Sequence, residues 1–316
     1  MNRKILRIGP ATLAVSLPMK WVRKFGLKKG EEIEVEEQGS IIRVGARKGV
    51  EKEGAIVDVG SLGSMAPKVI GMLYKAGYRK IKAIYSPNNE IIYKGKKTSE
   101  INVVKDTLDY LNGMQLWEIG NSRKDNIITS LESSKVNPKE FDNVLAKLYL
   151  HLIAQGEQVR DFLFYNTKIL DEIYLTERLI NQSADFCIRI LVVYGHERYD
   201  KSFQFYDIVT KLESTADKYL QIAIEFQKEK KVNKEIKIFI EKTIEFISQL
   251  NSLYLKFKYE KLIDLTKNVE KAISDYEREF KSKGNLINYN LYSLLIDIYE
   301  IVEKLYFLNS EYFKDD

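Results

Sequence analysis

Eight basic side chains lie within the first 29 residues, and no aspartate or glutamate accompanies them. Lysine and arginine neutralise phosphate groups, so a local excess of them attracts a polyanion such as a nucleic acid. The whole chain has 50 basic and 45 acidic residues, so without these eight it keeps 42 basic against 45 acidic. The positive charge is therefore concentrated in one short segment, carried by Arg3, Lys4, Arg7, Lys20, Arg23, Lys24, Lys28 and Lys29.

Other residue types with chemical potential are few. Cys187 is the sole cysteine, which excludes an internal disulfide and a thiolate metal cluster and is typical of a protein from a reducing cytoplasm. We expect it to be a small buried apolar residue. The two histidines, His151 and His196, have neither zinc-protease spacing nor a neighbouring nucleophile. No catalytic constellation is recognisable, so we expect no enzymatic activity.

Composition predicts a cytoplasmic protein of several domains. The chain has 316 residues, of which 45% are hydrophobic, and no stretch approaches 18 uninterrupted apolar residues. The amino terminus also has no apolar signal core, so we expect no membrane insertion. A length of this order is more than one hydrophobic core commonly serves, and two or three domains are expected.

The first segment, 1–48, is predicted to be β-rich. Residues 4–8 and 12–17 read as short strands, 19–25 as a helix too short to stand alone, and 32–44 as a hairpin with Ile33 and Val35 directed inward. A unit of about 48 residues cannot bury enough apolar surface by itself. We therefore expect a homodimer, in which the eight basic residues become sixteen around a two-fold axis.

The second segment, 54–135, alternates between strand and helix patterns. This alternation indicates a small two-layer α/β domain, and we interpret it as ferredoxin-like. The helices are predicted at 64–76 and 100–111. The strands are predicted at 55–59, 80–85, 90–93, 114–119 and 127–131.

The third segment, 138–314, has apolar residues at alternating steps of three and four, the spacing of helices that pack at shallow angles. Breaks in this pattern predict six helices of about 25 residues, most simply arranged as two successive three-helix sets. The breaks fall near Asn166, Gly195, Val232, Tyr259 and Gly284. The predicted fold class is thus α+β and multidomain.

One part of the basic segment resembles a known family. The run from Ser16 to Val35, with its Leu-Pro, Phe-Gly-Leu and Lys-Lys-Gly elements, is similar to the swapped-hairpin AbrB/SpoVT DNA-binding domains. The resemblance covers 2–46 and implies two chains that interleave their hairpins and present a basic surface to double-stranded DNA; some relatives of this fold are antitoxins. Many members carry Arg where this chain has Val22, which leaves Arg23 and Lys24 as the expected helix contacts. A solvated basic face is the alternative.

The helical segment resembles the PhoU family of phosphate-uptake regulators. Lys211 to Asp217 is similar to that family's Glu-x-x-x-Asp metal motif, which implies a divalent or iron-type metal on Glu213 and Asp217. A spacing of four places both carboxylates on one helical face, outside the apolar seam and therefore exposed. In the second set Glu300 is followed by Lys304, which is unfavourable for such a site. A solvated acidic face is the alternative.

The connecting run from Val69 to Ile81 resembles that of archaeal proteins joining an AbrB-type domain to a PhoU-like one. Together these resemblances imply a homodimeric transcription regulator of phosphate-uptake genes. Its helical domain would sense a signal or bind a transporter or kinase component. The alternative is a PhoU-like adaptor that acts through protein contacts, with the amino-terminal module used for dimerisation only.

Overall fold

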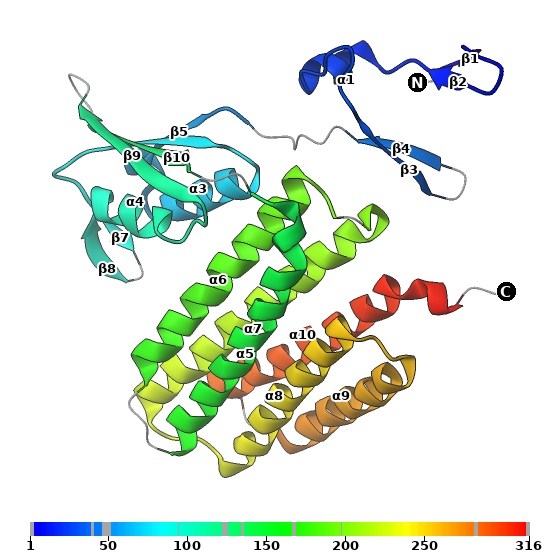
Figure 1. Cartoon of the computed structure of the whole chain (residues 1–316). Helices are drawn as coiled ribbons and strands as arrows, with labels where there is room; N and C mark the ends of the chain where they lie inside the picture. Colours follow the sequence, from blue (N-terminus) through cyan, green and yellow to red (C-terminus); the bar gives the residue numbers. More distant parts are fainter. Residues whose placement is uncertain are drawn as a thin grey trace. The chain divides into compact units, whose positions relative to one another are not determined.

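The structure is a computed structural model (Figure 1). Two compact units divide the chain, the first unit over 1–51 and the second unit over 52–316. The structure describes residues 3–38, 41–45, 52–93, 95–121, 126–133, 136–165, 169–196, 198–280 and 284–313.

Short strands and one short helix make up the first unit, as its sequence predicts. Strands β1 and β2 pair antiparallel, with Ile5 opposite Val15, across the turn that contains Gly9 and Pro10. Helix α1 ends before Gly26, whose φ of 60° favours a residue without a side chain. Its elements are β1 (Ile5–Arg7), β2 (Leu13–Val15), α1 (Met19–Lys24), β3 (Glu34–Gln38) and β4 (Ile41–Gly45). Gly39, in the predicted hairpin turn between β3 and β4, lies outside the described residues.

The second unit begins with a four-stranded sheet in the order β5-β6-β10-β9. Helices α3 and α4 supply apolar side chains that form one cluster with the sheet's inner face. A separate ribbon, β7 with β8, stands apart from the sheet. The elements are β5 (Ala55–Asp58), α2 (Val59–Leu62), α3 (Ala66–Lys75), β6 (Lys80–Tyr85), β7 (Glu90–Tyr93), β8 (Lys96–Ser99), α4 (Glu100–Leu108), β9 (Met114–Asn121) and β10 (Asn126–Glu132).

The sheet's connectivity differs from the ferredoxin-like prediction. Strands β5 and β6 lie side by side and parallel, with Val57 opposite Ala83. In a ferredoxin-like fold another strand separates the two parallel strands of each β-α-β unit. The prediction of that topology is therefore wrong: the alternating pattern indicates which segments are strands but does not specify their order across the sheet.

Six long helices follow, and their limits fall at the predicted breaks. The side-chain oxygens of Asn233 and Asn285 accept hydrogen bonds from the first backbone N–H groups of two of them, which explains where these helices begin. They are α5 (Phe141–Phe164), α6 (Leu170–Val193), α7 (Ser202–Glu229), α8 (Lys234–Leu255), α9 (Tyr259–Phe280) and α10 (Leu286–Leu308).

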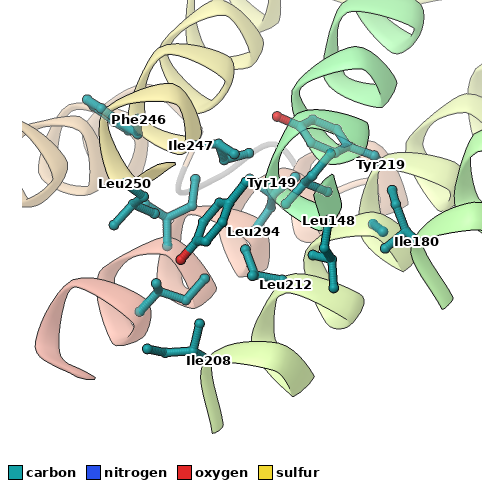
Figure 2. Packing of buried hydrophobic residues seen from close by; sticks show 14 of the residues in the cluster. Leu148, Tyr149, Ile180, Ile208, Leu212, Tyr219, Phe246, Ile247, Leu250 and Leu294 are labelled. Carbon is teal, nitrogen blue, oxygen red and sulfur yellow. The ribbon is translucent and has the colours of Figure 1, made fainter. Parts of the chain in front are cut away.

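The helices share one hydrophobic core. Figure 2 shows side chains from both halves of the helical region meeting in it, with Leu212 of α7 and Leu294 of α10 among them. Helix α10 packs against α7 as well as against α8 and α9. The predicted two three-helix sets are therefore joined through a common interior. Gly156 of α5 makes a close approach possible, because a Cβ there would lie 2.8 Å from Ile244 Cγ1.

None of the helices in the described part of the chain is both long enough and apolar enough to span a lipid bilayer. The helical faces explain why: each long helix carries charged residues on the side away from the shared core.

Candidate nucleic-acid interface

All eight basic side chains of the amino-terminal segment are exposed. Arg3, Lys4 and Arg7 belong to the first strand and its approach, and Lys20, Arg23 and Lys24 to α1. Within the described residues, no ion pair involves any of these eight. This is the arrangement that the acid-free composition of the segment predicts.

Local contacts orient some of these side chains. Arg7 Nη2 donates to the carbonyl oxygen of Pro10 at 2.7 Å and Nε donates to that of Gly9 at 3.3 Å, so its guanidinium lies against the β1–β2 turn. Lys24 Nζ lies 5.6 Å from the centre of the Phe25 ring. Arg23 and Lys24 occupy the last turn of α1. Arg23 is thus free to contact a ligand, whereas Arg7 combines that capacity with a structural role.

The described residues of the first unit form no core within one chain. None of their side chains is buried, and several apolar side chains of both strand pairs are exposed. Ile5 is 69% exposed and Ile42 is 69% exposed. Val35, predicted to point inward, is 60% exposed, while Ile33 is half-buried. Nothing in the described part of its own unit covers Val35, so its inward position stays a prediction for an assembly of two chains.

A family model matches this part of the chain. Residues 6–49 match the family described as "Antidote-toxin recognition MazE, bacterial antitoxin". The first unit carries a MazE/AbrB-type domain. Domains of this type bind DNA and dimerise, which is consistent with a DNA-binding or regulatory role. The match ends at residue 49 and does not concern the second unit. No curated protein and no solved structure matches the chain.

The predicted metal pair lies in different surroundings from those expected. Glu213 is half-buried rather than exposed, and Asp217 is exposed. Burial raises the pKa of Glu213 to about 7, assisted by the negative charges of Asp185, Asp217 and Glu177 and opposed by Lys75. The helical pattern alone does not predict this environment, because the charges that act on Glu213 include Lys75 of α3 and Asp185 of α6.

The ammonium group of Lys75 lies beside the carboxylates of Asp185 and Glu213. Lys75 Nζ, from the end of α3, lies 2.7 Å from Asp185 Oδ1 on α6. Burial alone would lower the pKa of Lys75, yet the carboxylates of Asp185 and Glu213 raise it above its ordinary value. In the described part of the chain, no three His, Cys, Asp or Glu residues come together as a metal site. The pair Glu213 and Asp217 therefore does not fit a metal ion without further ligands.

Glu300, the acidic residue at the corresponding position of the second helical set, forms an ion pair. Lys211 pairs with Glu300, and Lys304 Nζ lies 3.2 Å from Asp207 Oδ2. Both pairs join α7 to α10, and Lys218 of α7 adds a third by pairing with the buried Asp297. Glu300 and Lys304 therefore hold two helices together.

The remaining reactive groups are in structural positions. Cys187 is free and buried, as predicted, and burial raises the pKa of its thiol. His196 stacks on Phe205 with ring centres 4.0 Å apart, and its Nε2 lies 3.7 Å from Asp142 Oδ1. His151 is half-buried, and burial lowers its pKa. His151 lies within α5, whereas His196 follows the end of α6 and lies outside the helices.

We expect the Glu213→Gln variant to change the pH dependence of stability. The pKa of Glu213 is raised from 4.5 to about 7, so the folded chain holds this proton more tightly than the unfolded chain. Its carboxylate therefore lowers stability as pH rises from about 4.5 to 7, by at most about 3 kcal/mol. The variant, which has no such proton, should gain stability relative to wild type over that interval in urea titrations.

Glu229→Gln, at the exposed end of the same helix, is the matched control and should leave the pH profile unchanged. Parallel pH profiles for the wild type and the Glu213→Gln variant would show that Glu213 ionises normally in the folded protein.

Proposed function

We propose that the protein is a homodimeric, cytoplasmic transcription regulator that binds double-stranded DNA through its first unit. The observation that carries this proposal is the set of eight exposed basic side chains, without an ion pair among the described residues, on a domain of the MazE/AbrB type. Phosphate contacts by such side chains supply affinity and position, and contacts to base edges add sequence preference. The proposal assigns no catalytic group to the chain.

The proposal of a dimer rests on the exposed apolar side chains in the described part of the first unit. A single first unit leaves Ile5, Leu13 and Ile42 each more than half exposed, which is costly at about 25 cal/mol per Å² of apolar surface. In a two-fold symmetric dimer, each copy of the unit can cover these side chains of the other copy. The same association brings both sets of basic residues to one surface.

We assign a regulatory role to the helical region of the second unit. Its six helices in one bundle are consistent with the resemblance to PhoU-type regulators. From this resemblance we propose control of phosphate-uptake genes. A signal or a transporter or kinase component that binds this region would shift the relative placement of the two DNA-binding domains. Such coupling requires that the signal favour one placement over another.

The other candidate function is that of an adaptor. The exposed apolar face of the first unit would also serve a protein that only dimerises there and regulates transporter or kinase machinery through protein contacts. The basic side chains favour the DNA-binding candidate, since dimerisation does not require eight exposed charges without an ion pair in the described part of the chain.

The test is DNA binding by the full-length protein. We expect it to bind promoter fragments as a dimer at physiological salt in the presence of excess competitor DNA, as measured by fluorescence anisotropy and analytical ultracentrifugation. A dimer that shows no preference for any promoter over the competitor would favour the adaptor. A monomer would contradict both candidates.

A further inference from the structure

A cavity of about 400 Å³ opens between the end of α9 and the start of α10. Four of its eight described lining residues are aromatic, two are asparagines and one is a glutamate. The described lining residues are Tyr276, Glu277, Phe280, Gly284, Asn285, Asn288, Tyr289 and Tyr292. A volume of this size is in the range of small-molecule sites.

The aromatic wall is held in place by its own contacts. The rings of Tyr276 and Phe280 stack with centres 4.7 Å apart, and those of Tyr276 and Tyr292 stack at 6.1 Å. Tyr276 is buried and its hydroxyl donates to the Asn288 carbonyl oxygen at 2.9 Å. This part of the wall is therefore rigid, whereas Tyr289 is 67% exposed and lies at the mouth.

Electrostatics determine the class of ligand. Glu277 is the one charged side chain among the described lining residues, and its Oε1 accepts a hydrogen bond from the Tyr292 hydroxyl at 2.6 Å. The faces of tyrosine and phenylalanine rings are also negative, and both features attract a cation. The start of α10 would favour an anion, but the Asn285 side chain already accepts the Asn288 N–H.

We propose that this cavity binds a small organic cation whose nitrogen carries methyl or methylene groups, such as a quaternary ammonium compound. The apolar groups would contact the rings of Tyr276, Tyr289 and Tyr292, and the positive charge would lie near the Glu277 carboxylate. This site is separate from the basic surface of the first unit in its residues and in its charge. It offers the helical region a ligand of its own, and the proposal does not depend on DNA binding.

The test compares two probes of the same shape, choline and its neutral carbon analogue 3,3-dimethylbutan-1-ol. Calorimetric titration of the full-length protein should give saturable binding of choline that is about tenfold tighter than binding of the alcohol, since cation–π attraction is lost in the latter. Ligand-detected NMR should show the choline methyl resonance shifted by the aromatic rings.

Variants locate the site. Glu277→Gln keeps the acceptor for Tyr292 but removes the charge, and should weaken choline binding about fivefold to tenfold while leaving the alcohol unaffected. Tyr289→Ala should weaken choline binding, whereas Tyr289→Phe, which keeps the ring, should not. Glu260→Gln, at the opposite end of α9, is the control for charge on that helix and should bind choline as the wild type does.

Three results would overturn the proposal: equal affinity for choline and the alcohol, unchanged choline affinity in the Glu277→Gln variant, or no saturable choline binding. Phosphatidylcholine vesicles distinguish a free ligand from a lipid headgroup. We expect no co-sedimentation with them, and co-sedimentation without binding of free choline would contradict a small-molecule site.

Discussion

Replacement of Arg23 and Lys24 by alanine should weaken DNA binding and flatten its salt dependence. Each phosphate contact contributes a slope of about 0.9 in a plot of log K against log salt concentration. If both side chains of both chains contact phosphates, the slope falls by about 3.6 and affinity near 0.15 M salt falls by about three orders of magnitude. Anisotropy titrations over a series of salt concentrations measure both quantities.

The control must remove equal charge elsewhere. Lys230 and Lys231 are an adjacent, exposed pair after α7 in the second unit, and their double alanine variant should keep the wild-type slope. An Arg23 and Lys24 variant with the wild-type slope would place the DNA contacts elsewhere. Equal losses in both double variants would indicate an effect of net charge only.

Much of the element content can be predicted because it is local. Helix ends at Asn233 and Asn285 depend on caps that are visible in the sequence, and strands of the sheet layer show as short apolar runs. Strand order is not local. The parallel neighbours β5 and β6 are joined by α3, but whether a further strand inserts between them depends on packing across the sheet.

The heptad pattern predicts which helical face is buried but not what covers it. Ile180, Ile208 and Leu294 follow the apolar spacing of three and four residues in the third segment, and all are fully buried. The pattern does not predict that α7 packs against α10. The contact between these two helices includes charge partners more than 70 residues apart in the sequence, such as Lys218 and Asp297. Glu213 was predicted to be exposed for the same reason, because its neighbour Lys75 belongs to another segment.

The candidate DNA surface is predictable to a greater extent. Charge composition over 29 residues already singles out side chains that prove to be exposed and unpaired in the described part of the first unit. The apolar residues beside them, such as Val35, are exposed in one chain, as expected of a unit too small to bury them alone. Their partner surface belongs to an assembly, and a single chain does not contain it.

One buried arginine that the sequence does not single out joins the sheet layer to the helices. Arg189 of α6 is 1% exposed, and its Nη2 donates to Glu132 Oε1 at 2.8 Å. Its Nη1 donates to the carbonyl oxygens of Tyr74 and Tyr78 around the end of α3, where the helix dipole favours a cation. In the sequence, Arg189 lies within an apolar stretch beside the buried face of α6, and nothing in that stretch predicts these partners.

Replacing Arg189 by methionine should destabilise the protein by about 3 kcal/mol. The substitution keeps most of the volume but leaves the buried Glu132 carboxylate with Arg79 as its remaining cationic partner. It also removes the donor for two carbonyl oxygens, whose loss adds to the cost. Urea denaturation followed by circular dichroism should show a lower transition midpoint.

A double-mutant cycle separates charge from packing. In the Arg189→Met background, Glu132→Gln should recover part of the lost stability, because it removes the underpaired buried charge, whereas in wild type it should be destabilising. Arg178→Met on the same helix, where the guanidinium stacks 4.2 Å from the Tyr110 ring, should cost less than about 1 kcal/mol. Additive effects of the Arg189 and Glu132 substitutions would mean that this ion pair does not couple the sheet layer to the bundle.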